Sequence, residues 1–167
     1  MQFNNIYLAE IGASIEISVF APEGKTMAPA LPPKTKVEEW HAMLHVEPRS
    51  ETFLGQYQRI RQAEAYLLGL EELKGAKPVF KRYFLSDATN QQPVMEKDDS
   101  CTVSYIQQPP LDGSKLALWL YLQRGTEVIP SADRLRSTII RHNGYEHLWT
   151  MGMTTSDGAA TARRKPC

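Results

Sequence analysis

The chain has 167 residues, of which 42% are hydrophobic, and its 19 basic side chains balance its 19 acidic ones. This length suits one domain with part of a second, and the apolar content is enough for a packed core. A net charge of zero creates no field that would attract nucleic acid or an anionic membrane, so we expect neither as a partner.

The two cysteines, Cys101 and Cys167, lie far apart, and neither has a Cys or His at the spacing of metal ligands. His41 and His45 also lack a third ligand nearby in the sequence. We therefore expect reduced thiols, no bound metal and no cofactor. No apolar run approaches the roughly 18 residues that span a bilayer, and no basic segment opens the chain as in a signal peptide. These features predict a cytoplasmic protein.

The first elements in the chain are predicted strands. Residues 6–11 have strand composition and residues 15–20 alternate apolar and polar side chains, with Gly12 between the two runs. This pattern predicts a β-hairpin. Residues 22–36 contain several prolines and little periodicity, which predicts a loop. Residues 38–46 predict a third strand.

The clearest periodicity in the chain is helical. Apolar side chains recur at spacings of three and four, at Phe53, Tyr57, Ile60, Ala63, Leu67 and Leu70. Ser50 or Thr52 is a suitable N-cap, and Gly75 followed by Pro78 ends the pattern. We predict one long helix over residues 52–74.

The next segments predict strands separated by loops. Residues 79–85 are rich in aromatic side chains and predict a strand, whereas residues 86–99 predict a polar loop with at most a short helical turn. Residues 102–108 predict a strand that ends at Pro109. Residues 115–123 are apolar on both faces, which is typical of a central strand.

The last part of the chain repeats an earlier order of elements. Residues 131–140 predict a helical stretch, residues 147–153 a strand, and residues 154–162 a helix start. Strand, Ser/Thr-rich segment and helix also follow one another at residues 38–74. Two interpretations stay open: the beginning of a second similar unit, truncated, or a C-terminal extension of the first domain. We place the division between residues 1–125 and the remainder, 126–167.

Three runs carry a resemblance to a known family. Residues 79–87 (VFKRYFLSD) and residues 102–110 (TVSYIQQPP), which precede the Leu-rich strand, resemble segments of the RidA (YjgF) family, the second run being similar to its last hairpin. Residues 147–162 resemble the strand and helix start that open a RidA unit. The resemblance covers residues 37–123 and 145–162. It implies an α+β, chorismate-mutase-like fold, a mixed β-sheet with one long helix packed on it.

The resemblance also implies an activity and an assembly. Active members of the family hydrolyse reactive enamines and imines, such as 2-aminoacrylate, to ketones and ammonia. They are homotrimers with ligand pockets between subunits. An arginine holds the substrate carboxylate through two parallel hydrogen bonds, and a carboxylate and a bound water complete the proton transfers.

This chain departs from the family pattern at the residues that carry the chemistry. The arginine position falls near Ser100 and Cys101, where no arginine stands, and the acidic position falls near Ala117. Loss of such an anchor costs on the order of 2–5 kcal/mol. Arg82 is the nearest basic residue that is able to replace it. A sheet-edge or solvent role for Arg82 is the alternative.

Three more residues are ligand-binding candidates beside Arg82. Cys101 belongs to the matching segment, but its acidic neighbours Asp98 and Asp99 would raise its pKa, which fits a small strand residue better than a nucleophile. Tyr105 is suited to an aromatic pocket or to the core. Asn90 lies in the polar loop that would flank an intersubunit cleft.

Three functional hypotheses follow. The first is a RidA-like protein that binds or hydrolyses a small imine or enamine metabolite at an intersubunit pocket. The second is a non-catalytic RidA-like binding or scaffold module, that is, a pseudoenzyme. The third, RNA cleavage or inhibition of translation, is the least favoured, because the chain is neutral and lacks a basic–aromatic face. The expected partners are a small metabolite and two further copies of the chain.

Overall fold

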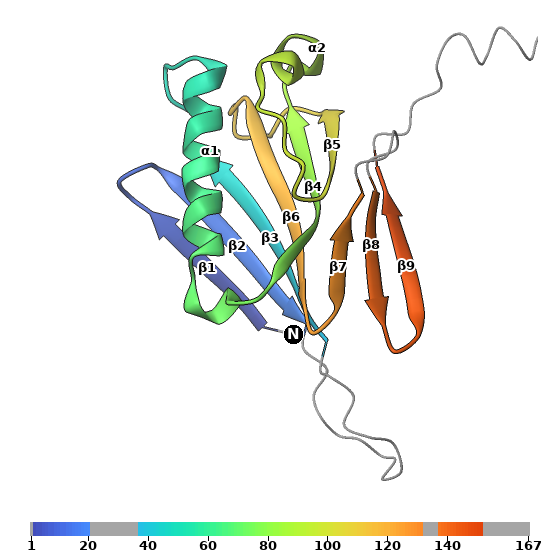
Figure 1. The fold of residues 1–167 in the computed structure, drawn as a ribbon. Coiled ribbons are helices and arrows are strands. Elements are labelled where there is room, and N and C mark those ends of the chain that lie inside the picture. The colour runs from blue at the N-terminus through green and yellow to red at the C-terminus, as the bar shows by residue number, and fades with distance from the viewer. Residues whose placement is uncertain (1, 21–36, 132–136, 152–167) are drawn as a thin grey trace, which may run out of the picture.

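The computed structural model describes residues 2–20, 37–131 and 137–151 and shows a six-stranded sheet, short helices and a separate three-stranded sheet (Figure 1). The predicted loop over residues 22–36 and the predicted helix start at 154–162 lie outside the described residues. No helix in the described ranges is long and apolar enough to cross a membrane.

The large sheet is mixed. Its strands are β1 (Gln2–Leu8), β2 (Ala13–Phe20), β3 (Glu38–Val46), β4 (Lys77–Leu85), β5 (Thr102–Gln107) and β6 (Leu116–Arg124). Their spatial order is β1-β2-β3-β6-β4-β5, and only the β4–β5 pair is parallel. The first two strands form the predicted hairpin, but its turn is residues 9–12, with Gly12 at φ 56°, so the first strand ends at Leu8 and not at residue 11 as predicted.

The strand pairing at the other end of the sheet differs from the prediction. Strands β5 and β6 do not form a hairpin, because β4 lies between them. Strand β6 is apolar on both faces and is buried almost throughout, so it takes a central position, between β3 and β4.

Helix α1 (Phe53–Leu68) covers one face of this sheet, which we call the inner face; the opposite face is the outer face (Figure 1). The buried stripe of α1 packs on alternate side chains of the central strands. The core side chains under the helix include Tyr57, Ile60, Ala63 and Leu67 of α1 and Ile15, Leu44, Leu118 and Leu120 of the sheet. This packing of the apolar face stabilises the helix, as tertiary contacts do for most helices in proteins.

The expected fold class, a chorismate-mutase-like fold with one long helix packed on the sheet, is wrong. The structure is mostly β, with 49% strand and 20% helix, and it has two short α-helices beside the mixed six-stranded sheet. The second helix is α2 (Ala88–Gln91), which follows β4. Two 3-10 turns, η1 (Glu71–Leu73) and η2 (Gln92–Val94), complete the helical elements of the described ranges.

The predicted helix over residues 52–74 is too long. Thr52 is the N-cap, and its Oγ1 accepts a hydrogen bond from the Gly55 amide at 3.3 Å. The helix already ends at Gly69, whose amide closes the last turn on the carbonyls of residues 65–67. Leu70 is then extended and packs against the core. Apolar spacing therefore continues past the point where the backbone leaves the helix.

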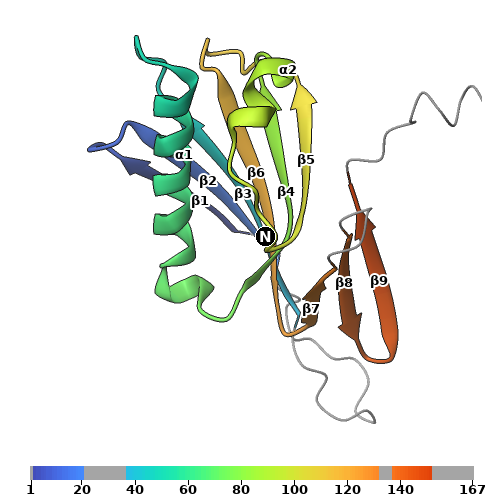
Figure 2. The same ribbon diagram turned by 45° about the horizontal axis from the view of Figure 1, so that its top comes forward.

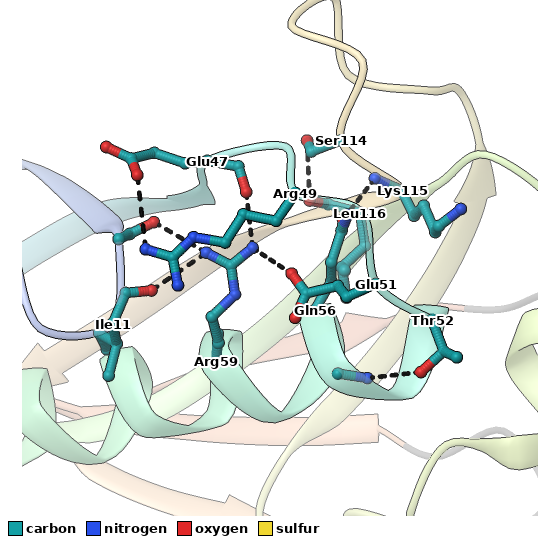
Figure 3. A network of polar contacts seen from close by, with 12 residues as sticks. Ile11, Glu47, Arg49, Glu51, Thr52, Gln56, Arg59, Ser114, Lys115 and Leu116 are labelled. Atoms are coloured by element: carbon teal, nitrogen blue, oxygen red, sulfur yellow. Dashed lines mark hydrogen bonds and ion pairs between the residues drawn. The ribbon is translucent and has the colours of Figure 1, made fainter.

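A buried arginine joins α1 to the loops at one end of the sheet. The Arg59 guanidinium donates to the carbonyls of Ile11 at 3.0 Å, Gly12 at 3.1 Å and Glu47 at 2.6 Å (Figure 3). It also forms an ion pair with Glu51. Because these carbonyls belong to the β1–β2 turn and the end of β3, one side chain holds three segments together.

The small sheet consists of β7 (Glu127–Pro130), β8 (Ser137–His142) and β9 (Tyr145–Thr150), all antiparallel. The expected helix over residues 131–140 is wrong where the structure describes it, because residues 137–142 form β8. Asn143 and Gly144 both have positive φ, 50° and 78°, as a two-residue hairpin turn requires. The predicted strand at 147–153 corresponds to β9.

The small sheet packs on the outer face of the large one, at one end of β4 and β6 (Figure 2). Val128 and Ile140 are buried there against Phe80 and Tyr121. The Thr138 Oγ1 also accepts a hydrogen bond from the backbone amide that opens β5, at 2.9 Å. The division into residues 1–125 and 126–167 stays a prediction.

Candidate functional site

The remainder of the outer face carries a row of side chains that includes one sequence-predicted candidate. Trp119 on β6 lies directly opposite Arg82 on β4, and Arg82 lies directly opposite Ser104 on β5. Side chains directly opposite one another on a sheet face are close enough to interact. The three side chains therefore form one continuous row, which we call the Arg82 site.

Arg82 is half-buried in an aromatic frame. Its Nε donates a hydrogen bond to the Ser104 Oγ at 3.2 Å. Its Cζ lies 5.4 Å from the centre of the Trp119 ring and 5.9 Å from that of Phe80. Cation–π contacts of this kind hold the guanidinium plane in place. The site thus presents a pre-oriented positive group on an apolar surface.

The terminal nitrogens of Arg82 are the exceptional feature. Within the described residues, every other arginine has a carboxylate within 4 Å, in the pairs Arg49–Glu47, Arg59–Glu51, Arg61–Glu96, Arg124–Glu38 and Arg141–Glu146. Arg82 forms no ion pair with those residues, and its Nη1 and Nη2 groups donate no hydrogen bond to them. A guanidinium with both terminal nitrogens available is able to bind a carboxylate through two parallel hydrogen bonds.

An aromatic cluster borders the Arg82 site. His41 on β3 stacks on Tyr121, with ring centres 4.5 Å apart and planes 15° apart. The Trp119 Nε1 donates a hydrogen bond to the His41 Nδ1 at 3.2 Å. Phe80 contacts Trp119 edge-on at 5.0 Å. These contacts fix the orientation of the Trp119 ring beneath the arginine.

The environment of His41 favours its neutral form. Burial lowers the pKa of His41, and the nearby Glu39 carboxylate opposes that shift only in part. Because Nδ1 accepts the hydrogen bond from Trp119, the neutral ring carries its proton on Nε2. His41 therefore presents a hydrogen-bond donor toward the outer face and is not a general base at Nε2.

A buried charge cluster occupies the inner side of β4. The Lys81 ammonium, which is 5% exposed, forms ion pairs with the carboxylates of Glu64 on α1 and Asp98 in the loop before β5. Burial lowers the pKa of Lys81, but the two carboxylates outweigh it and the net shift is upward. The Lys81 and Ser100 hydrogen bonds outweigh burial and lower the pKa of Asp98. One buried ammonium therefore lies between two carboxylates.

Cys101 is buried beside this cluster. Burial raises the pKa of the Cys101 thiol to about 12, and the Lys81 charge opposes the shift only in part. A thiol with such a pKa holds almost no thiolate at neutral pH, and the thiolate is the nucleophilic form. This environment supports the interpretation of Cys101 as a small structural residue.

The four sequence-predicted candidates do not converge on one site. Arg82 lies on the outer face. Tyr105 lies on the inner face, stacked on Tyr83 with ring centres 5.7 Å apart. Asn90 is exposed on α2, where its Nδ2 donates to the Asp87 Oδ2 at 2.6 Å. Cys101 lies on the side of Lys81. Arg82 alone belongs to the row described above.

Two residues of the row were missing from the predicted ligand-binding set. Ser104 is three residues from Cys101 in the sequence, but only the parallel β4–β5 pairing places it beside Arg82. Trp119 is half-exposed and lies on the outer face. The alternation of side chains along β6 is the sequence signal that places Trp119 on the face opposite to the leucines of the inner face.

Comparison of the chain with protein-family models, with curated proteins and with solved structures gives no match. Across the described ranges, no group of three or more His, Cys, Asp or Glu side chains is arranged to hold a metal ion.

Proposed function

We propose that this chain is a RidA-like, non-catalytic binding module for a small metabolite that carries a carboxylate, and that Arg82 binds the carboxylate. The observation that supports the proposal is that the Nη1 and Nη2 groups of Arg82 have no partner among the described residues, whereas Ser104 and two aromatic rings hold the guanidinium in place. Such a group is prepared for a planar anion. The RidA-like part of the proposal is supported by the local resemblance of residues 79–87, whereas residues 102–110 resemble a hairpin that this chain does not form.

A carboxylate fits the site better than a more highly charged anion. The described surroundings of Arg82 supply one positive charge, one hydroxyl and apolar ring surface from Phe80 and Trp119. A single arginine balances a single negative charge, and the rings suit a short carbon chain. A small 2-oxo or 2-imino acid has this composition, which is the ligand class that the RidA resemblance implies.

Binding without turnover is favoured over hydrolysis by the state of the nearby ionisable groups. Asp98, close to the position where the family pattern would place its arginine, is engaged with Lys81 in the buried charge cluster. His41 presents a donor next to Trp119. Neither group is free to accept a proton from a water molecule at the Arg82 site.

A homotrimer is part of the same proposal. The Arg82 site lies on an open sheet face, and small ligands bind in sites that surround most of their surface. Other copies of the chain would supply the missing walls. Three chains of 18.9 kDa have a mass of about 57 kDa, which native mass measurement tests directly.

The test is titration of the protein with 2-oxobutanoate, a stable carbonyl counterpart of the imino acid, followed by calorimetry. We expect saturable binding by the wild-type protein and at least about tenfold weaker binding by Arg82→Gln, because the charged hydrogen bonds are lost. Arg61→Gln is the matched control, since Arg61 is paired with Glu96 on the exposed side of α1. Equal binding by the wild type and Arg82→Gln would contradict the proposal.

A second assay separates a binding module from an enzyme. Enzymatically generated 2-aminoacrylate decays to pyruvate and ammonia in water, and an active protein accelerates that decay. We expect no acceleration by the wild-type protein. If the wild-type protein accelerates the decay and Arg82→Gln does not, the protein is a deaminase and not a binding module. Arg82 would then still be the residue that binds the carboxylate.

A further inference from the structure

Strand β9 is an open edge of the small sheet. Among the residues that the structure describes, it pairs with β8 alone, through a continuous register of six residues. Its large side chains are exposed: Tyr145 is 72% exposed, Leu148 66% and Trp149 37%. Edge strands with unpaired backbone groups accept another strand unless charge, proline or a bulge blocks them. The opposite edge, β7, has four residues and ends in Pro130, whereas β9 has no proline, lysine or bulge.

The register of the small sheet places its apolar side chains in a row. On the face that points away from the large sheet, Ile129 lies opposite Ile139, which lies opposite Leu148. The next row on this face is charged: Glu127, Arg141 and Glu146, with an ion pair of 2.6 Å between the last two. The apolar row runs up to the free edge and ends there, at the exposed Leu148.

We propose that a second copy of this chain binds at β9, by antiparallel pairing of the two β9 strands about a two-fold axis beside Leu148. Leu148 would lie opposite Leu148 of the partner subunit. The row of three apolar side chains then continues as a row of six across a joined six-stranded sheet. A two-fold contact uses the same surface on both copies, which is the commonest closed symmetry.

The side chains of β9 disfavour the registers that move the axis from Leu148 toward Glu146. A shift in one direction would place His147 at the axis and Leu148 opposite a charged Glu146. A further shift would place two Glu146 carboxylates opposite each other, and like charges directly opposite are destabilising. With Leu148 at the axis, Glu146 lies opposite Thr150 and His147 opposite Trp149. In this register no like charges face each other, and no charged side chain faces an apolar one.

Charge also identifies the partner as a second copy. Glu146 is already paired with Arg141 on the adjacent strand of its own chain. The edge therefore carries no uncompensated acid that would require a basic partner or repel an identical strand. Its exposed large hydrophobic side chains are Tyr145, Leu148 and Trp149, and the symmetric register places Leu148 opposite Leu148 of the partner subunit.

The contact centres on Leu148, which points away from the large sheet, so a change at Leu148 leaves the residues of the Arg82 site in place. Trp149 lies on the other face of β9 and packs on Phe80 and Tyr121, with ring centres 5.5 Å apart in both pairs. An assembly that contains the two-fold contact has an even number of chains. A dimer results if the contact acts alone, and six chains result if the trimer forms as well. Failure of the ligand experiment leaves the β9 proposal unchanged, and failure of the β9 experiment leaves the ligand proposal unchanged.

The first experiment measures native mass by light scattering. We expect an even number of chains for the wild type and half that mass for Leu148→Arg, since two arginines would face each other at the axis. Leu111→Arg is the matched control, because Leu111 is fully exposed far from β9, and it should retain the wild-type mass. An odd number of chains in the wild type, or an unchanged mass in Leu148→Arg, would overturn the proposal.

The second experiment tests the register in a Cys167→Ser background. Leu148→Cys should form a disulfide-linked dimer under mild oxidation, because opposite residues have Cβ atoms about 4.5–5.5 Å apart. In the same register, the two copies of Glu146→Cys lie about 14 Å apart and should not cross-link. Cross-linking of Glu146→Cys but not Leu148→Cys would exclude the register. As a control, the reduced Leu148→Cys and Glu146→Cys proteins are labelled with a thiol reagent. Equal labelling confirms that both thiols are accessible.

Discussion

The indole Nε1 of Trp119 donates a hydrogen bond to the Nδ1 of His41, 3.2 Å away across the neighbouring strands β6 and β3. The bond requires an imidazole with an unprotonated Nδ1. Protonation of His41 converts Nδ1 into a donor and breaks the bond. The position of Trp119, and with it the frame around Arg82, is therefore tied to the charge of one histidine.

We predict that stability falls as the solution is acidified through the pKa of His41. Burial lowers that pKa from its usual 6.5, so the unfolded chain binds the proton more readily than the folded protein. The stabilisation from neutral His41 is complete above the unfolded pKa and is lost as the pH falls through the lowered folded value. Urea unfolding between about pH 7.5 and 5.5, the range in which histidine titrates, measures the loss.

The matched variants for this measurement are His41→Gln and His147→Gln. Glutamine does not titrate, so His41→Gln should show a flatter dependence of stability on pH than the wild type. His147→Gln changes an exposed side chain on β9, keeps the hydrogen bond between Trp119 and His41, and is the comparison for the loss of that bond. Parallel curves for the wild type and His41→Gln would show that His41 does not carry this effect.

We predict that Lys81→Met lowers the free energy of unfolding by about 3–5 kcal/mol, because it leaves the carboxylates of Glu64 and Asp98 close together without their shared cation. The double variant with Glu64→Gln should recover part of the loss. Lys74→Met is the control, since Lys74 is 79% exposed and its pair with Glu71 is long, at 3.8 Å. Urea unfolding that shows equal effects at Lys81 and Lys74 would contradict this account.

The sequence predicts the local elements well and the non-local ones poorly. Residues 38–46 form β3 as predicted, because alternating burial leaves a clear period of two. The helix prediction extends to residue 74 because Leu70 keeps the apolar spacing, although the chain has already left the helix at Gly69. The spacing of apolar residues indicates which side chains are buried. It does not indicate whether the backbone at each of those residues is helical or extended.

The candidate site depends on strand pairing that no local pattern encodes. Arg82 and Ser104 are 22 positions apart and meet only because β4 and β5 are parallel neighbours. The predicted pairing of β5 with β6 would have placed Ser104 beside Trp119 instead. The missing carboxylate partner of Arg82 is also a property of the folded chain, since the other arginines obtain theirs from different loops and strands.

We predict that the native Cys101 thiol is unreactive. It is buried, and its pKa is raised to about 12, so its thiolate fraction at neutral pH is very small. In a Cys167→Ser background, labelling with iodoacetamide should be slow in buffer and complete in denaturant, as read by mass spectrometry. Rapid labelling of the folded protein would show that the thiol is accessible and would return Cys101 to the list of possible nucleophiles.

The final prediction concerns Arg59, which joins α1 to the β1–β2 turn. Arg59→Met removes charged hydrogen bonds to the carbonyls of Ile11, Gly12 and Glu47 and leaves those acceptors without that donor. Each such bond is worth about 1.5–3 kcal/mol, and they are not additive, so we expect a loss of about 3 kcal/mol in the free energy of unfolding.

Arg49→Met is the matched control for Arg59→Met. Arg49 lies in the same network (Figure 3), but its side chain is 45% exposed and its ion pair with Glu47 is 3.6 Å long. Exposed pairs of this kind contribute less than about 1 kcal/mol. Urea unfolding of both variants therefore separates the contribution of buried carbonyl contacts from that of charge alone. Equal losses would mean that the charge, and not the placement of the guanidinium among the carbonyls, stabilises this end of the sheet.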